Sequence, residues 1–299
     1  MNFESIHHLN IQWQDVKIFF NSVFFTAIAG SLAGAFAGAY GAQRIVERAK
    51  YRGELLKEIR NTNAATNVSF SVCNSFLSMK KQYVKPLKET FETQKAALLD
   101  HQNKRRLGEI SKDKLFEFSA DLQTLSLPQL PVDILQTQVF EKLSLMGRPL
   151  NLATTLSQTA HSLSASLEKR NQLIESYKVN APTLQDVFVA LYFGLPHGRY
   201  INQDYPSSLD AIYSQTDDGI FFSQLLCKDL VEHGEQIAAR FKKKYGKGAP
   251  TINKLDFTKA ETLGLMPKAD NYADWVTMFV KNTDSPTFLE RIRLRLKRH

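Results

Sequence analysis

Residues 18–42 run for 25 consecutive positions without Asp, Glu, Lys or Arg. A helix rises about 1.5 Å per residue, so these residues would span about 37 Å, whereas the hydrocarbon layer of a bilayer is about 30 Å thick. Trp13 precedes the stretch and Tyr40 lies near its end, and amphipathic rings favour the lipid–water boundary. We therefore predict a single N-terminal transmembrane helix over residues 18–42.

Two other interpretations of this stretch stay open. A helix in a globular core can be apolar on all sides, although 25 uncharged residues is long for one. The small-residue triplets at 27–29 and 35–37 resemble signal-peptide cleavage sites. A signal peptide, however, begins with a positive region and has an apolar core of about 7–15 residues. Residues 1–17 carry two acidic residues and only Lys17, so the pattern favours an uncleaved anchor.

Most of the cations near the stretch lie after it. Lys17 alone precedes it, and six cations follow it closely: Arg44, Arg48, Lys50, Arg52, Lys57 and Arg60. The positive-inside rule therefore predicts a short extracytoplasmic N-terminus (residues 1–17) and a cytoplasmic remainder (residues 43–299), with a bacterial inner membrane as the expected location. Cys73 and Cys227 would then lie in a reducing compartment, where we expect small buried thiols rather than a disulfide or a metal pair.

One face of the uncharged stretch is built from small residues. Gly30, Gly34 and Gly38 recur every four positions, and Ser31 and Gly41 widen the same face. Transmembrane helices associate where small residues let two backbones approach closely. The pattern therefore predicts a homo-oligomer held by this face. A passive anchor is the alternative, because glycine is common in membrane helices.

Apolar positions continue beyond residue 42 at seven-residue intervals. One series contains Leu56, Asn63, Phe70, Leu77, Val84 and Phe91, and the second contains Ile59, Thr66, Cys73, Lys80 and Leu87. Thr66 and Lys80 are poor core residues, so the heptad pattern is only half filled. The pattern fits a parallel coiled coil or one helix of an intrachain bundle. Pro86 should end or kink this helix, since proline lacks the N–H group and clashes with the preceding turn.

Further helical patterns complete an elongated bundle over residues 43–180. We expect a charged helix over 87–107 that ends at Gly108, a short helix over 134–145 capped by Asp133, and a long helix that follows Gly147 and ends near Tyr177. Residues 181–299 contain six prolines and predict a smaller helical C-terminal domain. Its expected helices start near Thr183, at Ser207, before the stripe of Phe222 to Phe241, and at Ser285. The predicted fold class is mainly α.

The sequence carries no motif of a known catalytic, metal or nucleotide site. It lacks a phosphate-binding glycine loop, a His-Glu-x-x-His helix, a Cys-x-x-Cys pair and a Gly-x-Ser-x-Gly elbow. We therefore predict no catalytic residue, cofactor or metal, and His233 is interpreted as an ordinary helix residue. The most polar cluster, with His197, Arg199 and Asp204 in an expected loop, is a candidate ligand-binding loop.

The net charge of +8 is densest at the C-terminus. Arg291, Arg293, Arg295, Lys297 and Arg298 surround an apolar helix side there, a pattern typical of a segment that rests on the anionic inner leaflet. Packing of that apolar side on the bundle is the alternative. Nucleic acid is not an expected partner, because no aromatic-interleaved binding module accompanies the charge.

These features predict a non-enzymatic single-pass membrane protein that self-associates and presents a cytoplasmic sensing or binding domain to an unidentified protein partner, as a scaffold or signalling component. A membrane-permeabilising effector of a bacterial toxin or antiviral defence system is the first alternative. A membrane-tethered enzyme without a familiar motif is the second. The sequence does not specify the trigger, the subunit number or the organism.

Overall fold

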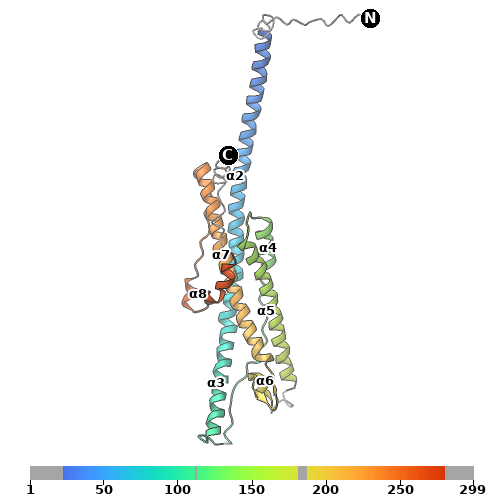
Figure 1. Cartoon of the computed structure of the whole chain (residues 1–299), viewed down its shortest axis with the longest axis vertical. Helices are drawn as coiled ribbons and strands as arrows, with labels where there is room; N and C mark the ends of the chain where they lie inside the picture. Colours follow the sequence, from blue (N-terminus) through green and yellow to red (C-terminus); the bar gives the residue numbers. More distant parts are fainter. Residues whose placement is uncertain (1–22, 112, 181–186, 280–299) are drawn as a thin grey trace, which may run out of the picture. The chain divides into compact units, whose positions relative to one another are not determined.

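The structure, a computed structural model, describes residues 23–111, 113–180 and 187–279 and is mainly helical (Figure 1). This confirms the predicted fold class at the level of mainly α. The chain divides after Lys57 into two compact units. We call the part up to Lys57 the N-terminal unit and the part from Glu58 onward the helical domain, and we describe each by itself.

The first described helix, α2 (Val23–Met79), supplies the whole described part of the N-terminal unit and the first helix of the helical domain. Between Thr26 and Glu54, Gly41 is half-buried and all other residues are exposed. Among the residues that the structure describes, no helix combines the length and hydrophobicity that a membrane span requires. The predicted transmembrane helix over 18–42 is therefore not supported here, and its first five residues lie outside the described ranges.

The helical domain continues from α2 through one π-helical turn, η1 (Lys80–Val84), into α3 (Lys85–Leu107). A connection of 24 residues, Gly108 to Pro131, leads to α4 (Val132–Glu141). The elements that follow are α5 (Arg148–Val179), α6 (Phe188–Phe193), β1 (Pro196–His197), β2 (Tyr200–Ile201), α7 (Asp204–Tyr245), α8 (Thr258–Thr262), η2 (Ala269–Tyr272) and α9 (Ala273–Thr277). The strands β1 and β2 form an antiparallel hairpin.

The second heptad series forms the buried stripe of α2 and α3: Ile59, Thr66, Cys73, Lys80 and Leu87 are all at most 7% exposed. This stripe packs against α7 of the same chain. Ser69 Oγ donates to the carbonyl of Ser223 at 3.1 Å, and Phe76 fills the space beside Gly219. Residue numbers rise along α2 as they fall along α7, so the two helices are antiparallel. Within the helical domain, the heptad pattern therefore belongs to an intrachain bundle.

Pro86 does not end the helical path. The π-helical turn η1 lies directly before it, and Pro86 occupies the first turn of α3, where a missing N–H group costs least. A proline inside a helix removes one hydrogen bond and crowds the preceding turn. The wider π-helical turn accommodates both effects, so the change of hydrogen bonding replaces the expected helix end.

Several predicted helix ends are confirmed. Gly108 ends α3 in the left-handed conformation at φ 75°, and α5 runs from Arg148 to Val179 with its leucine stripe buried. Asp133 is not a cap, because α4 begins at Val132 and its N-cap, Pro131, provides no side-chain hydrogen bond. The two helices expected between 207 and 245 are one helix, α7. Residues 181–186, which include the helix start expected near Thr183, lie outside the described ranges. The helix expected at Ser285 also lies outside them.

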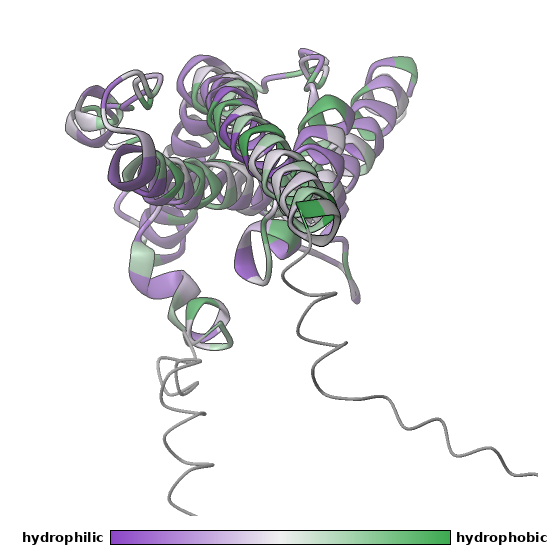
Figure 2. Cartoon of the chain, turned by 90° about the horizontal axis from the view of Figure 1, so that it is seen from above, coloured by the Kyte–Doolittle hydropathy of each residue, from purple (hydrophilic) through white to green (hydrophobic). Residues whose placement is uncertain are grey.

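Two apolar clusters stabilise the helical domain. The larger one combines α2, α4, α5 and α7 with Ala260 and Leu265, so residues on both sides of position 180 share one core. The boundary expected between 180 and 181 therefore does not separate two hydrophobic cores. A second, aromatic cluster joins α3, α5, α6 and the start of α7. Figure 2 shows hydrophobic and hydrophilic residues alternating around the helices, as burial of one helix face requires.

Candidate functional site

The glycine face predicted from the sequence lies on α2 in the N-terminal unit. A Cβ atom added at Gly30, Gly34, Gly38 or Gly41 would meet no atom within 4 Å. Ser31 Oγ donates to the carbonyl of Ile28 at 2.9 Å, so its hydroxyl is satisfied within the helix. Among the described residues, therefore, no other segment of the chain packs against these glycines.

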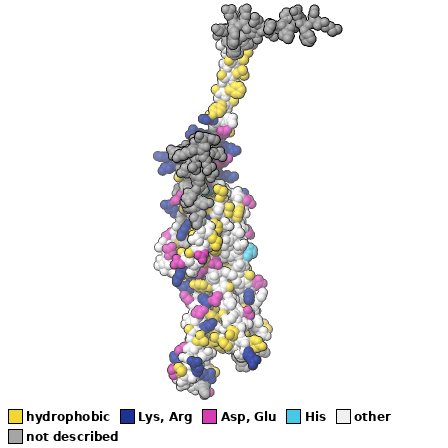
Figure 3. Space-filling model, viewed as in Figure 1, with side chains coloured by type: hydrophobic (Ala, Val, Ile, Leu, Met, Phe, Trp, Pro, Cys, Tyr) yellow, Lys and Arg dark blue, Asp and Glu magenta, His cyan; other side chains and the backbone are white. Residues whose placement is uncertain are grey.

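Large apolar side chains on the same stretch are equally uncovered. Ile28, Leu32, Phe36 and Tyr40 are exposed by 41%, 54%, 75% and 59%, respectively. Figure 3 shows hydrophobic side chains along the first described turns of α2, with Lys and Arg side chains after them. The guanidinium of Arg44 lies 5.1 Å from the ring centroid of Tyr40, at the point where apolar sequence gives way to charged sequence.

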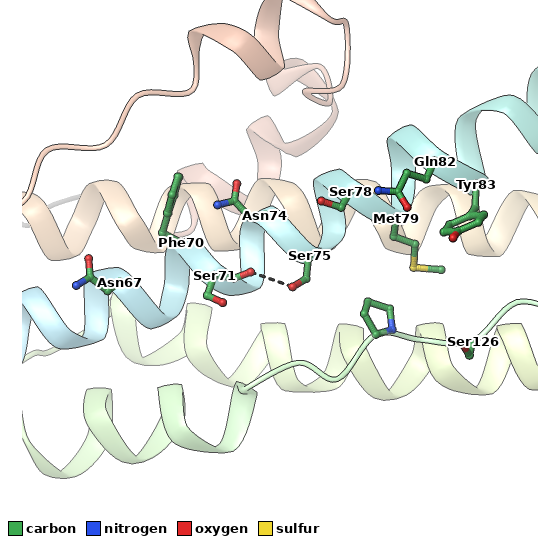
Figure 4. Close-up of a pocket in the computed structure, with 11 residues that line it drawn as sticks. Asn67, Phe70, Ser71, Asn74, Ser75, Ser78, Met79, Gln82, Tyr83 and Ser126 are labelled. Carbon is green, nitrogen blue, oxygen red and sulfur yellow. Dashed lines mark hydrogen bonds between the residues drawn. The ribbon is translucent and has the colours of Figure 1, made fainter.

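One cleft of the helical domain, about 560 Å³, lies between α2 and the connection after α3 (Figure 4). Asn74, Ser75 and Ser78 follow one another along α2, and Ser126 faces them from the connection (Figure 4). The remaining lining residues are Asn67, Phe70, Ser71, Met79, Gln82, Tyr83 and Pro128. This lining is polar but uncharged. It can form hydrogen bonds with a neutral ligand, but it provides no carboxylate, imidazole or amine for acid–base chemistry.

A second cleft, of about 460 Å³, has charged walls. Arg148 forms an ion pair with Asp229 on α7. Beside them, Glu58 Oε1 accepts hydrogen bonds from Ser144 N at 2.7 Å, Ser144 Oγ at 2.8 Å and His233 Nε2 at 2.9 Å. Burial raises the pKa of Glu58, but the hydrogen bonds from Ser144 and His233 outweigh it and leave the pKa below its usual value.

The Glu58, Ser144 and His233 side chains contain the residue types of a hydrolase triad without its geometry. In a triad, the hydroxyl donates to the imidazole and the imidazole donates to the carboxylate. Here the hydroxyl and the imidazole both bind the same carboxylate oxygen. The serine hydroxyl therefore does not meet an imidazole as it would in a triad, and the cluster instead ties α2, α7 and the segment after α4 together.

A buried ion pair lies in the larger core. Lys80 is 2% exposed and donates to Asp217 on α7 and to the carbonyl of Leu265 at 2.9 Å. Burial raises the pKa of Asp217 and of its neighbour Asp218, against the opposing influence of Lys80 and Tyr272. Lys80 therefore fixes the segment after α8 to the α2–α7 pair.

The polar loop predicted from the sequence is a hairpin rather than a pocket. His197 is the last residue of the exposed strand β1, and Arg199 lies in the exposed turn that follows it. Asp204 is the first residue of α7. Asp204 Oδ2 accepts a hydrogen bond from Asn202 at 3.1 Å. These side chains line neither of the two clefts above. The basic residues Arg291, Arg293, Arg295, Lys297 and Arg298 lie outside the described ranges.

The cysteine prediction is confirmed for burial and pairing: Cys73 and Cys227 are buried and free. Burial raises the pKa of Cys73 to about 11 and that of Cys227 to about 12, so both remain protonated thiols at neutral pH. Within residues 23–111, 113–180 and 187–279, no group of three His, Cys, Asp or Glu side chains could hold a metal ion.

Sequence reasoning missed both clefts. The sequence contains a pattern that could have indicated the uncharged cleft. Polar residues without charge repeat there at helical spacing on one face: Asn67, Ser71, Asn74, Ser78 and Gln82. No such pattern indicates the charged cleft, because Glu58 and His233 are 175 positions apart in the sequence. Comparisons with protein-family models, curated proteins and solved structures found no match to this chain.

Proposed function

We propose that this chain is a non-enzymatic membrane protein. Residues 18–42 anchor it and associate with other copies, and a cytoplasmic helical domain binds a partner. The observation that carries this proposal is the glycine face of α2, where an added Cβ would meet nothing within 4 Å among the described residues beyond the glycine's own turns of helix. Glycine weakens a helix by about 1 kcal/mol relative to alanine, so glycines that recur on one face imply close packing by another chain.

The surroundings of the glycine face favour lipid as its medium. Leu32 and Phe36 on α2 are exposed by 54% and 75%, in a sequence that carries no charge from residue 18 to residue 42. Water around such a surface is unfavourable by about 25 cal/mol per Å² of apolar area. Exposed Arg44, Arg48 and Lys50 follow at once, which supports a cytoplasmic orientation for the rest of the chain.

The non-enzymatic part of the proposal rests on the chemistry of the two clefts. The uncharged cleft offers hydrogen bonds without a carboxylate, an imidazole or an amine. In the charged cleft, Ser144 and His233 each bind Glu58 rather than each other. These arrangements suit binding and structural roles.

A membrane two-hybrid assay of residues 18–42 tests the proposal. Gly34→Leu should weaken self-association about tenfold, which corresponds to about 1.4 kcal/mol, because a leucine holds the backbones apart. Ala29→Leu introduces the same side chain on the other side of the helix and should leave association unchanged. Equal association of the wild type and Gly34→Leu would refute the proposal. A membrane-potential dye in the same cells separates the two modes of action, since only a pore depolarises the membrane.

A further inference from the structure

Residues 115–125, which we call the strap, cross the aromatic cluster of the helical domain in an extended conformation. Burial alternates along its first half: Phe116, Phe118 and Ala120 are half-buried, whereas Leu115 and Ser119 are exposed. This period of two is that of a β-strand with one buried face. The strap is nevertheless not assigned as a strand and pairs with none in the described part of the chain.

Helix side chains take the place of the missing neighbouring strand. They bond to main-chain groups of alternate strap residues: Gln94 Nε2 donates to Ser119 O at 3.0 Å, Asp121 N donates to Tyr192 Oη at 3.1 Å, Tyr205 Oη donates to Asp121 O at 3.2 Å, and Arg170 Nη1 donates to Gln123 O at 2.8 Å. Asn171 binds both main-chain groups of Leu125, at 3.0 Å and 2.6 Å. Recognition of this kind reads the backbone and not the sequence.

The apolar side chains of the strap enter aromatic surroundings. The ring of Phe118 lies 5.1 Å from that of Phe193 and 5.8 Å from that of Tyr192, measured between centroids. The ring of Phe116 lies 5.5 Å from the imidazole of His101. Backbone hydrogen bonds combined with pockets for alternate side chains are the two elements by which proteins bind extended peptides.

Some buried polar atoms beside the strap have no hydrogen-bond partner. Arg170 Nε, Gln94 Oε1 and His101 Nε2 are buried without a hydrogen-bond partner. Arg170 is 0% exposed, and the partners of its two Nη atoms are carbonyl oxygens and the hydroxyl of Tyr205. An unsatisfied buried polar atom costs about 1–3 kcal/mol. The groove therefore has more hydrogen-bonding capacity than its present occupant uses.

We propose that Gln94, Arg170, Asn171, Tyr192 and Tyr205 form a binding groove for an extended peptide, and that the strap is its tethered occupant. The partner is a protein segment with aromatic or aliphatic residues at alternate positions, which displaces the strap. The connection from Gly108 to Pro131 has 24 residues, and irregular connections longer than about 12–15 residues are usually functional or disordered. This inference rests on the proposed function only in giving the helical domain a partner.

Peptide exchange tests the groove directly. Protease sites inserted after the exposed residues Glu109 and Gln129 in the full-length chain allow the strap to be cut free at both ends. The probe is a fluorescent peptide with the sequence of residues 113–127, followed by anisotropy. It should bind the cut chain and not the uncut chain. A peptide that carries Phe116→Ser and Phe118→Ser should not bind.

Matched variants on α5 make the result specific. In the cut chain, Asn171→Ala removes the two hydrogen bonds to Leu125 and should weaken peptide binding about tenfold. Gln172→Ala changes an exposed neighbour and should leave binding unchanged. A strap that does not exchange, or helical circular dichroism that is lost when the strap leaves, would overturn the proposal, because the strap would then be part of the core. Either failure leaves the Gly34→Leu association assay unaffected.

Discussion

Glycines in the two units of the chain have opposite surroundings. At Gly219 on α7 an added Cβ would lie 2.5 Å from the ring of Phe76, and at Gly234 it would lie 2.8 Å from Ile252. At Gly30, Gly34 and Gly38 it would meet nothing within 4 Å. The glycines of the helical domain are thus explained by contacts within the chain. Those of the N-terminal unit have no such contact among the described residues, and we propose that another copy of the chain provides it.

Apolar side chains repeat this contrast. In the helical domain, Phe76, Leu156 and Leu226 are fully buried by other helices. In the N-terminal unit, Leu32 and Phe36 are mostly exposed. A helical apolar pattern therefore predicts that a face will be covered, but it does not say whether the same chain, another copy or lipid covers it.

The largest expected loss of stability follows from a substitution in the core of the helical domain. Lys80→Ala leaves Asp217, whose side chain is 17% exposed, without its cation, and loss of one partner of a buried ion pair costs up to about 3–5 kcal/mol. We expect a loss of this order in the free energy of unfolding of the full-length chain, measured by urea and circular dichroism. The double variant Lys80→Met, Asp217→Leu removes both charges and should lose much less. Equal losses in the single and double variants would contradict a role for the ion pair.

The next largest effect is expected when one glycine of each unit is replaced by alanine. Gly219→Ala forces a methyl group against Phe76 and should destabilise the helical domain by about 1–3 kcal/mol. Gly34→Ala lies outside the helical domain, at a position without contacts among the described residues, and should leave the unfolding of that domain unchanged. Thermal unfolding of both variants checks this difference. Equal melting temperatures would remove the distinction between packed and open glycines.

A smaller, pH-dependent effect is expected at Glu58. Its pKa is lowered in the folded state, because hydrogen bonds from Ser144 and His233 outweigh the effect of burial. The stabilisation is therefore complete above the ordinary pKa of 4.5 and is lost as the pH falls through the lower folded value. Glu58→Gln should cost about 1 kcal/mol at pH 7, and the difference from wild type should shrink towards pH 3. A difference that is constant with pH would show that the charge is not involved.

The sequence predicted elements whose signals are local. Gly108 after a charged helix and the leucine stripe from Leu152 to Leu167 each depend on neighbouring residues, so both were confirmed. The heptad pattern located the buried stripe, but Thr66 and Lys80 were regarded as poor core residues, although both are buried. Lys80 is stabilised there by Asp217, which is 137 positions away.

Features built from distant residues could not be predicted. The main-chain contacts of the strap join Gln94 to Ser119 and Tyr192 to Asp121, and their side chains carry no spacing that identifies a groove. The hairpin at His197 was expected as a loop because three polar residue types cluster there. Their side chains line neither of the two clefts described above. Local propensity therefore predicts helices better than it predicts sites.

Oxidative cross-linking of the full-length protein in membranes tests the central claim most directly. Ser31→Cys is nearly isosteric and lies on the glycine face, whereas Ala29→Cys lies on the other side of the helix. The native cysteines, Cys73 and Cys227, are buried and should stay silent. Our account predicts that the Ser31→Cys chain forms a disulfide-linked dimer and that the Ala29→Cys chain does not. Equal cross-linking at both positions, or none at Ser31→Cys, would contradict it.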